Sequence, residues 1–254
     1  MTPPLAPHAL RHTHDSHDCP RTGSVPDRSA AFLKHIENPD FPCVGSKAAL
    51  AQDAIRTLEL GALGQRSNDA ALLDGLAKFA RHLAAQPPES KVVHSFVAIF
   101  DGPTDTDEMR FEALLWSQLQ RLHLLDVRRG NAWADGVSRN PDSPKFSLSL
   151  AGHPFFVIGL HPGASRIARR FAWPAMVFNS HVQFDRLRED GRYEKMQKAT
   201  RARDLALQGS INPNLADFGT APETRQYSGR KVEADWKCPF HSIKSQSKTG
   251  APRD

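Results

Sequence analysis

Four histidines lie at the ends of segments whose composition is typical of strands: His94, His153, His161 and His181. A neutral imidazole can bind a transition metal, and an imidazole titrating near neutral pH can move a proton. A single histidine at such a place is more commonly a hydrogen-bonded structural group. Four histidines that meet at one end of a sheet would instead favour a metal or cofactor site, and the sequence leaves both interpretations open.

Three arginines, Arg166, Arg169 and Arg170, follow a strand-like segment and a glycine-containing turn. Guanidinium groups in a loop beside a core strand suit bidentate binding of carboxylates or phosphates. Imidazole next to such arginines fits a haem pocket, where one neutral histidine binds the iron and arginines pair with the propionates. Cys43 or Cys238 could also supply a thiolate to haem, although the neighbours of both favour small buried thiols.

The 254-residue chain has a formal net charge of +5, and its positive charge is concentrated in one stretch. Residues 161–203 carry ten Lys and Arg side chains against four Asp and Glu side chains. A nucleic-acid groove would spread basic residues along a face with aromatic residues between them, so this local cluster favours a small anionic group. The helical basic residues of the stretch are expected to be ordinary solvated charges: Arg186, Arg188, Arg192, Lys195 and Lys198.

The segments that must position these residues are helices and strands in mixed order. Apolar residues at three- and four-residue spacing predict helices over 30–37, 47–60, 69–85, 107–125, 182–190 and 193–208. β-Branched and aromatic residues predict strands over 92–100, 146–150, 155–160 and 175–179, of which the middle two form a hairpin. We therefore predict an α+β fold, a single domain with a central, mainly antiparallel sheet packed by helices.

Both ends of the chain are expected to be disordered: a Pro- and His-rich leader over 1–28 and a polar tail over 242–254, which leaves a folded unit over 29–241. The leader holds several possible metal ligands in surroundings that indicate incidental low complexity: His8, His12, His14, His17 and Cys19. Apolar stretches too short for a bilayer span, no signal-peptide pattern and an odd number of cysteines predict a cytoplasmic protein with reduced thiols.

The common catalytic signatures, namely a glycine-rich phosphate loop, HExxH, CxxC and GxSxG, are absent from the sequence. Longer motifs carry more information: FPCVG at 41–45, LQRLH at 119–123, GLHPGASRIARRF at 159–171, VFNSHVQF at 177–184, RDLALQGSINPNL at 203–215, RQYSGR at 225–230 and WKCPF at 236–240. Together these motifs, which span roughly residues 38–240, resemble the YqcI/YcgG family, and specifically its haem-dependent guanidine N-hydroxylase branch.

The resemblance implies protohaem (haem b), dioxygen, an external electron donor, and insertion of one oxygen atom into a guanidine N–H bond. The substrate that it implies is L-arginine, converted to Nω-hydroxy-L-arginine, or a related arginine-derived guanidine. The folded unit would then be the haem-binding catalytic domain.

Residue roles follow from the same resemblance. His161 and His94 are the first candidates for the iron ligand, and His181 is a distal-pocket acid or a third candidate. Glu223 is the first candidate to accept the guanidinium, with a solvated surface position as its alternative, and Tyr227 could donate a hydrogen bond in the same pocket or serve only in turn packing. Cofactor contacts, including those to the propionates, are expected from Arg166, Arg169, Arg170 and Asn179, whereas Asp217 and Glu112 are weaker candidates for the guanidinium acceptor.

Two other functions compete with this one. A non-redox module that binds an anionic ligand or nucleic acid would use the same arginines, and a haem sensor would use the same pocket without the reaction. The enzyme should be red-brown with a Soret band, whereas the binding module should be colourless, with an affinity that falls steeply with salt. We expect neither a nucleic acid nor a membrane as partner.

Overall fold

A single five-stranded sheet forms the centre of the protein. The structure is a computed structural model and describes residues 26–87, 89–214, 216 and 219–243. Its strands are β1 (Ile55–Leu60), β2 (Ser95–Phe100), β3 (Leu148–Leu150), β4 (His153–Leu160) and β5 (Ala175–Ser180). The strand order is β1-β2-β5-β4-β3, in which β1 runs parallel to β2 and every other neighbouring pair is antiparallel.

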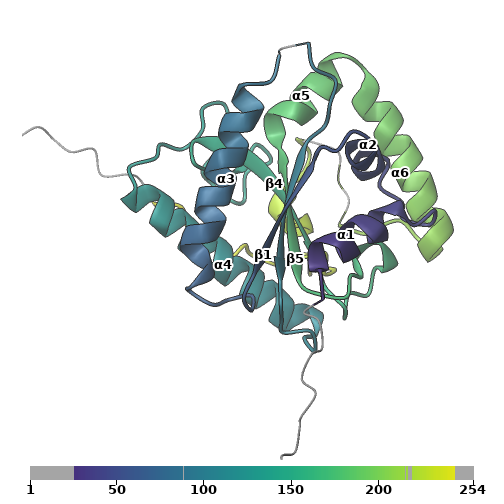
Figure 1. The fold of residues 1–254 in the computed structure, drawn as a ribbon, viewed down its shortest axis with the longest axis horizontal. Helices are drawn as coiled ribbons and strands as arrows, with labels where there is room; N and C mark the ends of the chain where they lie inside the picture. Colours follow the sequence, from purple (N-terminus) through teal and green to yellow (C-terminus); the bar gives the residue numbers. More distant parts are fainter. Residues whose placement is uncertain (1–25, 88, 215, 217–218, 244–254) are drawn as a thin grey trace, which may run out of the picture.

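Helices cover both faces of this sheet (Figure 1). One face carries α3 (Asn68–Ala84) and α4 (Glu108–Arg128), which we call the α3/α4 layer. The other carries α1 (Arg28–Glu37), α2 (Val44–Ala51) and α6 (Arg192–Gln208), which we call the α1/α2/α6 layer. The remaining helices are α5 (His181–Glu189), directly after β5, and the short 3-10 helices η1 (Ile167–Arg169) and η2 (Glu223–Gln226).

Successive residues of the central strands serve opposite faces of the sheet. In β2, Phe96, Ala98 and Phe100 belong to the core on the α3/α4 side, whereas Val97 and Ile99 belong to the core on the other side. This alternation follows from the two-residue repeat of an extended strand. All six residues of β2 are buried, and the five that follow Ser95 form a continuous apolar run, as is typical of a strand covered on both faces.

The α3/α4 layer is closely packed against the sheet. Leu115 and Leu119 of α4 have no exposed surface, and they recur at the spacing that keeps one helix face inward. A Cβ atom on Gly159 of β4 would lie 2.7 Å from Cε1 of Phe111, so only glycine allows this close approach of strand and helix. Asp107 begins α4 by accepting a hydrogen bond from the Arg110 amide at 2.7 Å.

The α1/α2/α6 layer is packed less uniformly. Asp27 caps the start of α1, its carboxylate accepting from the Ala30 amide at 2.7 Å, and the helix buries Phe32 and Ile36 against the sheet. By contrast, α6 has no fully buried residue along its 17 residues. Gly191 precedes the helix and Gly209 follows it, and both have left-handed backbone angles that end the helical path. α6 is therefore a separate helix that lies over this face of the sheet.

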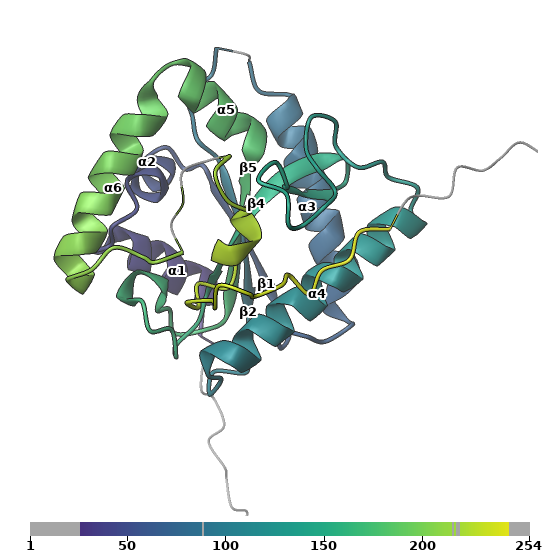
Figure 2. The ribbon, with the colours of Figure 1, turned by 180° about the vertical axis from the view of Figure 1, so that it is seen from behind.

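The segment after α6 returns across the molecule and runs beside α4 (Figure 2). β3 pairs with residues 153–155 of β4. Further along β4, the Gly159 amide donates to the Tyr227 carbonyl oxygen at 2.7 Å. The Tyr227 ring stacks on Trp116 of α4, with ring centroids 5.4 Å apart. The segment therefore completes the edge of the sheet and contributes to the core.

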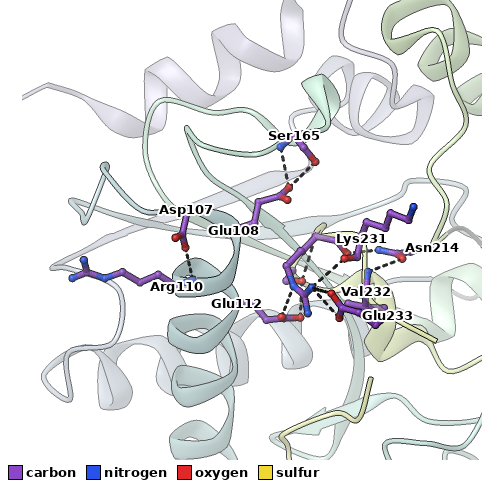
Figure 3. A network of polar contacts seen from close by, with 11 residues as sticks. Asp107, Glu108, Arg110, Glu112, Ser165, Asn214, Lys231, Val232 and Glu233 are labelled. Atoms are coloured by element: carbon purple, nitrogen blue, oxygen red, sulfur yellow. Dashed lines mark hydrogen bonds and ion pairs between the residues drawn. The ribbon is translucent and has the colours of Figure 1, made fainter. Parts of the chain in front are cut away.

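A buried ion pair holds this segment to α4 (Figure 3). Arg230 Nε lies 2.7 Å from Glu112 Oε2, and both side chains are 8% exposed. Glu233 also contacts the Arg230 guanidinium, at 2.9 Å, and the Asn214 side-chain amide donates to the Arg230 carbonyl oxygen. Glu112 is thus held by a structural cation, which argues against its use as the acceptor of a substrate guanidinium.

The predicted α+β fold is confirmed, with one element of the wrong type. The helix predicted over 47–60 ends at Ala51, and residues 55–60 form β1 instead. Asp53, at a φ of 50°, breaks the helix, and Ile55 and Thr57 then pair in parallel with β2. The predicted hairpin is present, with Ala151 and Gly152 at positive φ in its turn.

The expected disordered ends fall largely outside the described residues, as do the leader histidines and Cys19. Within the described part, α1 begins at Arg28, one residue inside the predicted leader, and the Ile243 amide donates to His123 Nε2 at 2.9 Å. None of the helices in this part of the chain is long and apolar enough to cross a membrane.

Candidate functional site

Two adjoining cavities lie between the sheet and the α1/α2/α6 layer. The first, of about 230 Å³, contains Glu223, and we call it the Glu223 cavity. The second, of about 220 Å³, contains Arg169, and we call it the Arg169 cavity. They share these lining residues: Cys43, Ser46, Ser95, Phe156, Ile158, Thr200, Arg201 and Gln226. Together they have the volume of a site for a small organic ligand, roughly 300–1,000 Å³.

Three elements supply most of the polar groups in the Glu223 cavity. β5 presents Asn179, whose Oδ1 accepts from Ser95 Oγ at 2.7 Å. α5 presents His181, Phe184 and Arg188, at intervals of three and four residues that place them on one helix face. α6 presents a further row of lining residues: Tyr193, Met196, Gln197, Thr200 and Arg201. The exposed pattern of α6 is therefore explained, because its inner face lines cavities instead of filling a core.

Glu223 is the buried carboxyl group of this cavity. It is 7% exposed, and its Oε1 accepts from the Tyr227 hydroxyl at 2.6 Å. The same hydroxyl lies 3.2 Å from the carbonyl oxygen of Phe155. Burial raises the pKa of Glu223 to about 8, against the lowering effects of Tyr227, Ser147 and the Arg188 charge. Glu223 therefore mostly holds a proton at neutral pH.

His181 is the histidine that faces this cavity. It is 6% exposed and is the first residue of α5. Burial lowers its pKa, and Arg188 lowers it further, whereas Asp185 raises it; the Asp185 carboxylate lies 3.7 Å from Nε2. At neutral pH the cavity thus contains a neutral imidazole, the form that binds a metal.

The three predicted anchoring arginines are held largely by the protein itself. Arg166 Nη2 lies 2.5 Å from Asp204 Oδ2 and 2.8 Å from the Ser210 carbonyl oxygen. Arg169 donates to the Gly159 and Gln226 carbonyl oxygens at 3.1 and 3.2 Å, and burial lowers its pKa to about 10. Both line the Arg169 cavity, whereas Arg170 lines a separate open depression on the surface.

The two histidines expected first as iron ligands lie at opposite ends of the sheet. His161 follows Leu160, which pairs with Ala175 at one end of β5, while His94 precedes Ser95, which pairs with Asn179 near the other end. At about 3.3 Å per residue, these ends are on the order of 15 Å apart. A single iron therefore cannot be bound by both side chains.

Neither of these histidines lines the two cavities. His161 is 1% exposed and stacks on Phe111 with ring centroids 4.2 Å apart. His94 meets His82 edge-on at 4.9 Å, beside a void of about 30 Å³. His153 lies at the same end as His94 and His181, with Nε2 at 2.8 Å from Ser180 Oγ. Three of the four histidines thus share an end of the sheet, and only His181 reaches a cavity of ligand size.

The cysteines and the remaining acids also differ in position. Cys43 lies where the two cavities adjoin, and its Sγ accepts from the Ser46 amide at the start of α2. Cys238 belongs to the packed core, where burial raises its pKa to about 12. Asp217 falls outside the described residues. Within the described residues, no group of three or more His, Cys, Asp or Glu side chains could hold a metal ion.

One functional candidate, Arg188, was assigned the wrong environment by the sequence. It was expected as a solvated helix charge, but its side chain is 21% exposed and lines the Glu223 cavity. The signal was present in the helix periodicity, because Arg188 lies seven residues after His181 and four after Phe184. Its burial also required the cover provided by α6, which the composition of α6 does not indicate.

An α+β chain of this kind, with a ligand-sized cavity on one face of its sheet, has relatives in known families. The chain belongs to the YqcI/YcgG family, whose model matches residues 32–241. It is 26% identical over 224 residues to a Streptomyces lavendulae protein named "Putative N(omega)-hydroxy-L-arginine synthase DcsA". That similarity covers 82% of this chain and 81% of DcsA. No solved structure matches the chain significantly.

Proposed function

We propose that this protein is a haem-dependent monooxygenase that hydroxylates a nitrogen of a guanidine group, with L-arginine or a related arginine derivative as substrate. The observation that carries the proposal is the Glu223 cavity, which brings a buried carboxyl group and a neutral imidazole together. Membership of the family and the name of DcsA, which is that of an N(omega)-hydroxy-L-arginine synthase, support arginine as the kind of substrate.

The residues around the two cavities fit a haem group. Their shared wall is apolar at Phe156 and Ile158, and cationic side chains at Arg166 and Arg169 line one cavity. His181 offers a neutral nitrogen ligand, and Cys43 offers a sulfur ligand where the cavities adjoin. This geometry makes His181 a better candidate for the iron ligand than His94 or His161. Cys43 is the alternative ligand, and in that case His181 would serve as an acid in the pocket.

When bound, haem would supply the activation of dioxygen that N-hydroxylation requires. One oxygen atom enters the guanidine N–H bond, and the other leaves as water with two electrons from an external donor and two protons. The chain itself has to bind, orient and enclose the guanidine. Phe156, Phe184 and Ile158 give the cavity an apolar lining that would displace water around a bound substrate, and charge interactions are stronger in such surroundings.

Glu223 is the group in this cavity that suits a guanidinium. A carboxylate accepts two parallel N–H bonds from a planar guanidinium, so this contact orients the group as well as binding it. An arriving cation favours the ionised form of Glu223, and the proton leaves as the substrate binds. Tyr227 then holds one carboxylate oxygen through its 2.6 Å hydrogen bond and fixes the orientation of the acceptor.

The test starts from the colour of the purified full-length protein after reconstitution with haem. We expect the wild-type protein to show a Soret band. The ferric and ferrous–CO spectra of the protein should change in His181→Ala if His181 is the iron ligand, or in Cys43→Ser if Cys43 is. His94→Ala and His161→Ala are the matched controls and should keep the wild-type bands. A colourless protein whose ligand affinity falls steeply with salt would overturn the proposal in favour of an anion-binding module.

A second assay separates the enzyme from a haem sensor. The holoenzyme, supplied with dioxygen, an electron donor and L-arginine, should form Nω-hydroxy-L-arginine in amounts that exceed the enzyme concentration. A haem protein that binds arginine but yields no hydroxylated guanidine under these conditions would contradict the monooxygenase assignment.

A further inference from the structure

We propose that Arg188 binds the carboxylate of the substrate, so that the Glu223 cavity recognises an amino acid with a guanidine side chain and not a guanidine alone. This inference rests on the proposed function, because it assigns the substrate of the same site. It places the two ends of the substrate on two named residues, Glu223 for the guanidinium and Arg188 for the carboxylate.

Arg188 is positioned by contacts with Asp185 of α5 and Tyr193 of α6. Its Nη1 lies 2.6 Å from Asp185 Oδ1, one helical turn earlier on α5. Its guanidinium lies over the ring of Tyr193, 4.6 Å from the centroid. Tyr193 lines the same cavity, from the first turn of α6. The arginine is thus oriented before a ligand arrives, which lowers the entropy lost on binding.

A guanidinium held in this way can still serve a ligand. It carries five N–H groups in a planar fork, so it can contact Asp185 and a ligand carboxylate together. Bidentate binding of carboxylates is the geometry that distinguishes arginine from lysine. With 21% of its side chain exposed, Arg188 lies in surroundings where this pairing is screened less than at the surface.

The charges of the cavity match the two ends of arginine. Glu223 and Arg188 both line it, and they are close enough for the Arg188 charge to favour the ionised form of Glu223. A substrate with a cation at one end and an anion at the other compensates both side chains. A guanidine without a carboxylate offers Arg188 no anion, and one that ends in an ammonium group, as agmatine does, brings a like charge towards it, which is unfavourable in a closed site.

The other arginines suit this role less well. Arg166 is ion-paired with Asp204 much as Arg188 is with Asp185, so the position of Arg166 and Arg169, and not their pairing, distinguishes them from Arg188. Both line the Arg169 cavity, on the far side of the shared wall from Glu223. Arg186, on the same helix as Arg188, lines neither cavity, which makes it a matched control for the loss of a positive charge on α5.

The experiment compares three ligands on the full-length protein by isothermal titration calorimetry. L-Arginine carries both charged ends, agmatine lacks the carboxylate, and L-citrulline keeps the carboxylate but has a neutral side-chain end. The wild-type protein should bind arginine about 10- to 100-fold more tightly than agmatine. Citrulline should also bind more weakly than arginine, because it offers Glu223 no cation.

The variants assign each end of the ligand. Arg188→Met should weaken arginine binding about 10- to 100-fold and change agmatine binding by less than about threefold. Glu223→Gln should weaken the binding of arginine and agmatine alike. Arg186→Met should leave all affinities unchanged. Arg188→Lys, which keeps the charge but loses the fork, should show an intermediate preference and covers the case in which the Met variant does not fold.

Two results would overturn the assignment of Arg188. One is a wild-type protein that binds agmatine as tightly as arginine. The other is an Arg188→Met or Arg188→Lys protein that keeps the full preference for arginine over agmatine. If such a variant also loses its haem, Arg188 contacts the cofactor and not the substrate. Either result leaves guanidine hydroxylation intact, because agmatine could still be hydroxylated, whereas absence of a Soret band counts against the proposed function alone.

Discussion

The two faces of the central sheet are built differently. On the α3/α4 side, side chains such as Phe111, Leu115 and Leu119 have no exposed surface and fill the space between helix and strand. On the α1/α2/α6 side, the same strands face two cavities of about 230 and 220 Å³. The packed α3/α4 face therefore contributes most of the core packing. The α1/α2/α6 face can then keep unfilled space of the size that a ligand needs.

The contrast extends to the two buried glutamates. Glu112, on α4, is paired with Arg230 at 2.7 Å. Glu223 faces the cavity with Tyr227 as its neighbour, and burial raises its pKa to about 8. Glu112 is satisfied by an internal cation and serves the fold, whereas the described hydrogen bond of Glu223 comes from a hydroxyl, which fits its proposed role as acceptor of a ligand cation.

The largest expected effect comes from breaking the satisfied pair. Glu112→Gln leaves the buried Arg230 cation with only Glu233 as an anionic partner, and we expect a loss of about 3–5 kcal/mol in the free energy of unfolding. Glu223→Gln should not destabilise the protein at pH 7 and should raise its free energy of unfolding, because Gln resembles the protonated acid and removes the cost of keeping Glu223 protonated in the folded state. Urea denaturation of both variants measures the difference, and equal losses would contradict the division between the two glutamates.

Core truncations on the two faces should also differ. Leu119→Ala removes a side chain with no exposed surface from the packed layer, and we expect a loss of about 3 kcal/mol. Ile158→Ala lies on the wall that the two cavities share, so fewer packing contacts are lost, and we expect about 1 kcal/mol. The comparison of the two faces fails if chemical denaturation shows the same loss for both substitutions.

Much of the fold could be predicted from local sequence patterns. The repeat of apolar residues identifies α4, and the turn at Ala151 and Gly152 identifies the hairpin. β1 was missed because its residues continue the helical spacing of the preceding segment, and its strand conformation comes from pairing with β2. A local pattern contains no information about a partner that lies some 40 residues further along the chain.

The site was predictable only in part, for a related reason. Asn179 and His181, from the motif at 177–184, line the Glu223 cavity together with Glu223, which lies between two of the recognised motifs. The distance between His161 and His94 depends on the directions of β4 and β2 in the sheet, which the spacing of residues does not determine. The environment of Arg188 depends on the position of α6, and this is a property of tertiary packing.

A third prediction uses pH to separate the two glutamates. The pKa of Glu223 rises from 4.5 in the unfolded chain to about 8 in the folded protein, so the folded state binds the extra proton between these values. Stability should therefore fall as pH rises through this window, by up to about 1.4 kcal/mol per pH unit, and level off above pH 8.

The difference in unfolding free energy between wild type and Glu223→Gln isolates this contribution, because the other titrating groups are common to both proteins. Measured by urea denaturation from pH 5 to pH 9, it should decline and then become constant. A difference that is independent of pH would show that Glu223 keeps an ordinary pKa in the folded protein.

The smallest expected effect tests the hydroxyl that links the packed face to the cavity. Tyr227 stacks on Trp116, and its hydroxyl, hydrogen-bonded to Glu223, lowers the pKa of that carboxyl group. Tyr227→Phe keeps the ring and removes the hydrogen bond, so we expect about 1 kcal/mol less stability and a pKa of Glu223 above 8. Binding of arginine requires the carboxylate, so affinity should fall severalfold at pH 7 and recover as pH approaches 9.

Tyr193→Phe is the matched control, because Tyr193 is the other tyrosine of the chain and also lines the cavity. Its hydroxyl makes no described contact with Glu223, so the substitution should leave the pH dependence of arginine binding unchanged. If Tyr227→Phe weakens binding equally at every pH, Tyr227 acts through packing alone. Recovery of arginine affinity at high pH would instead show that the Tyr227 hydroxyl, which extends from the packed face of the sheet, controls the pKa of Glu223 in the cavity.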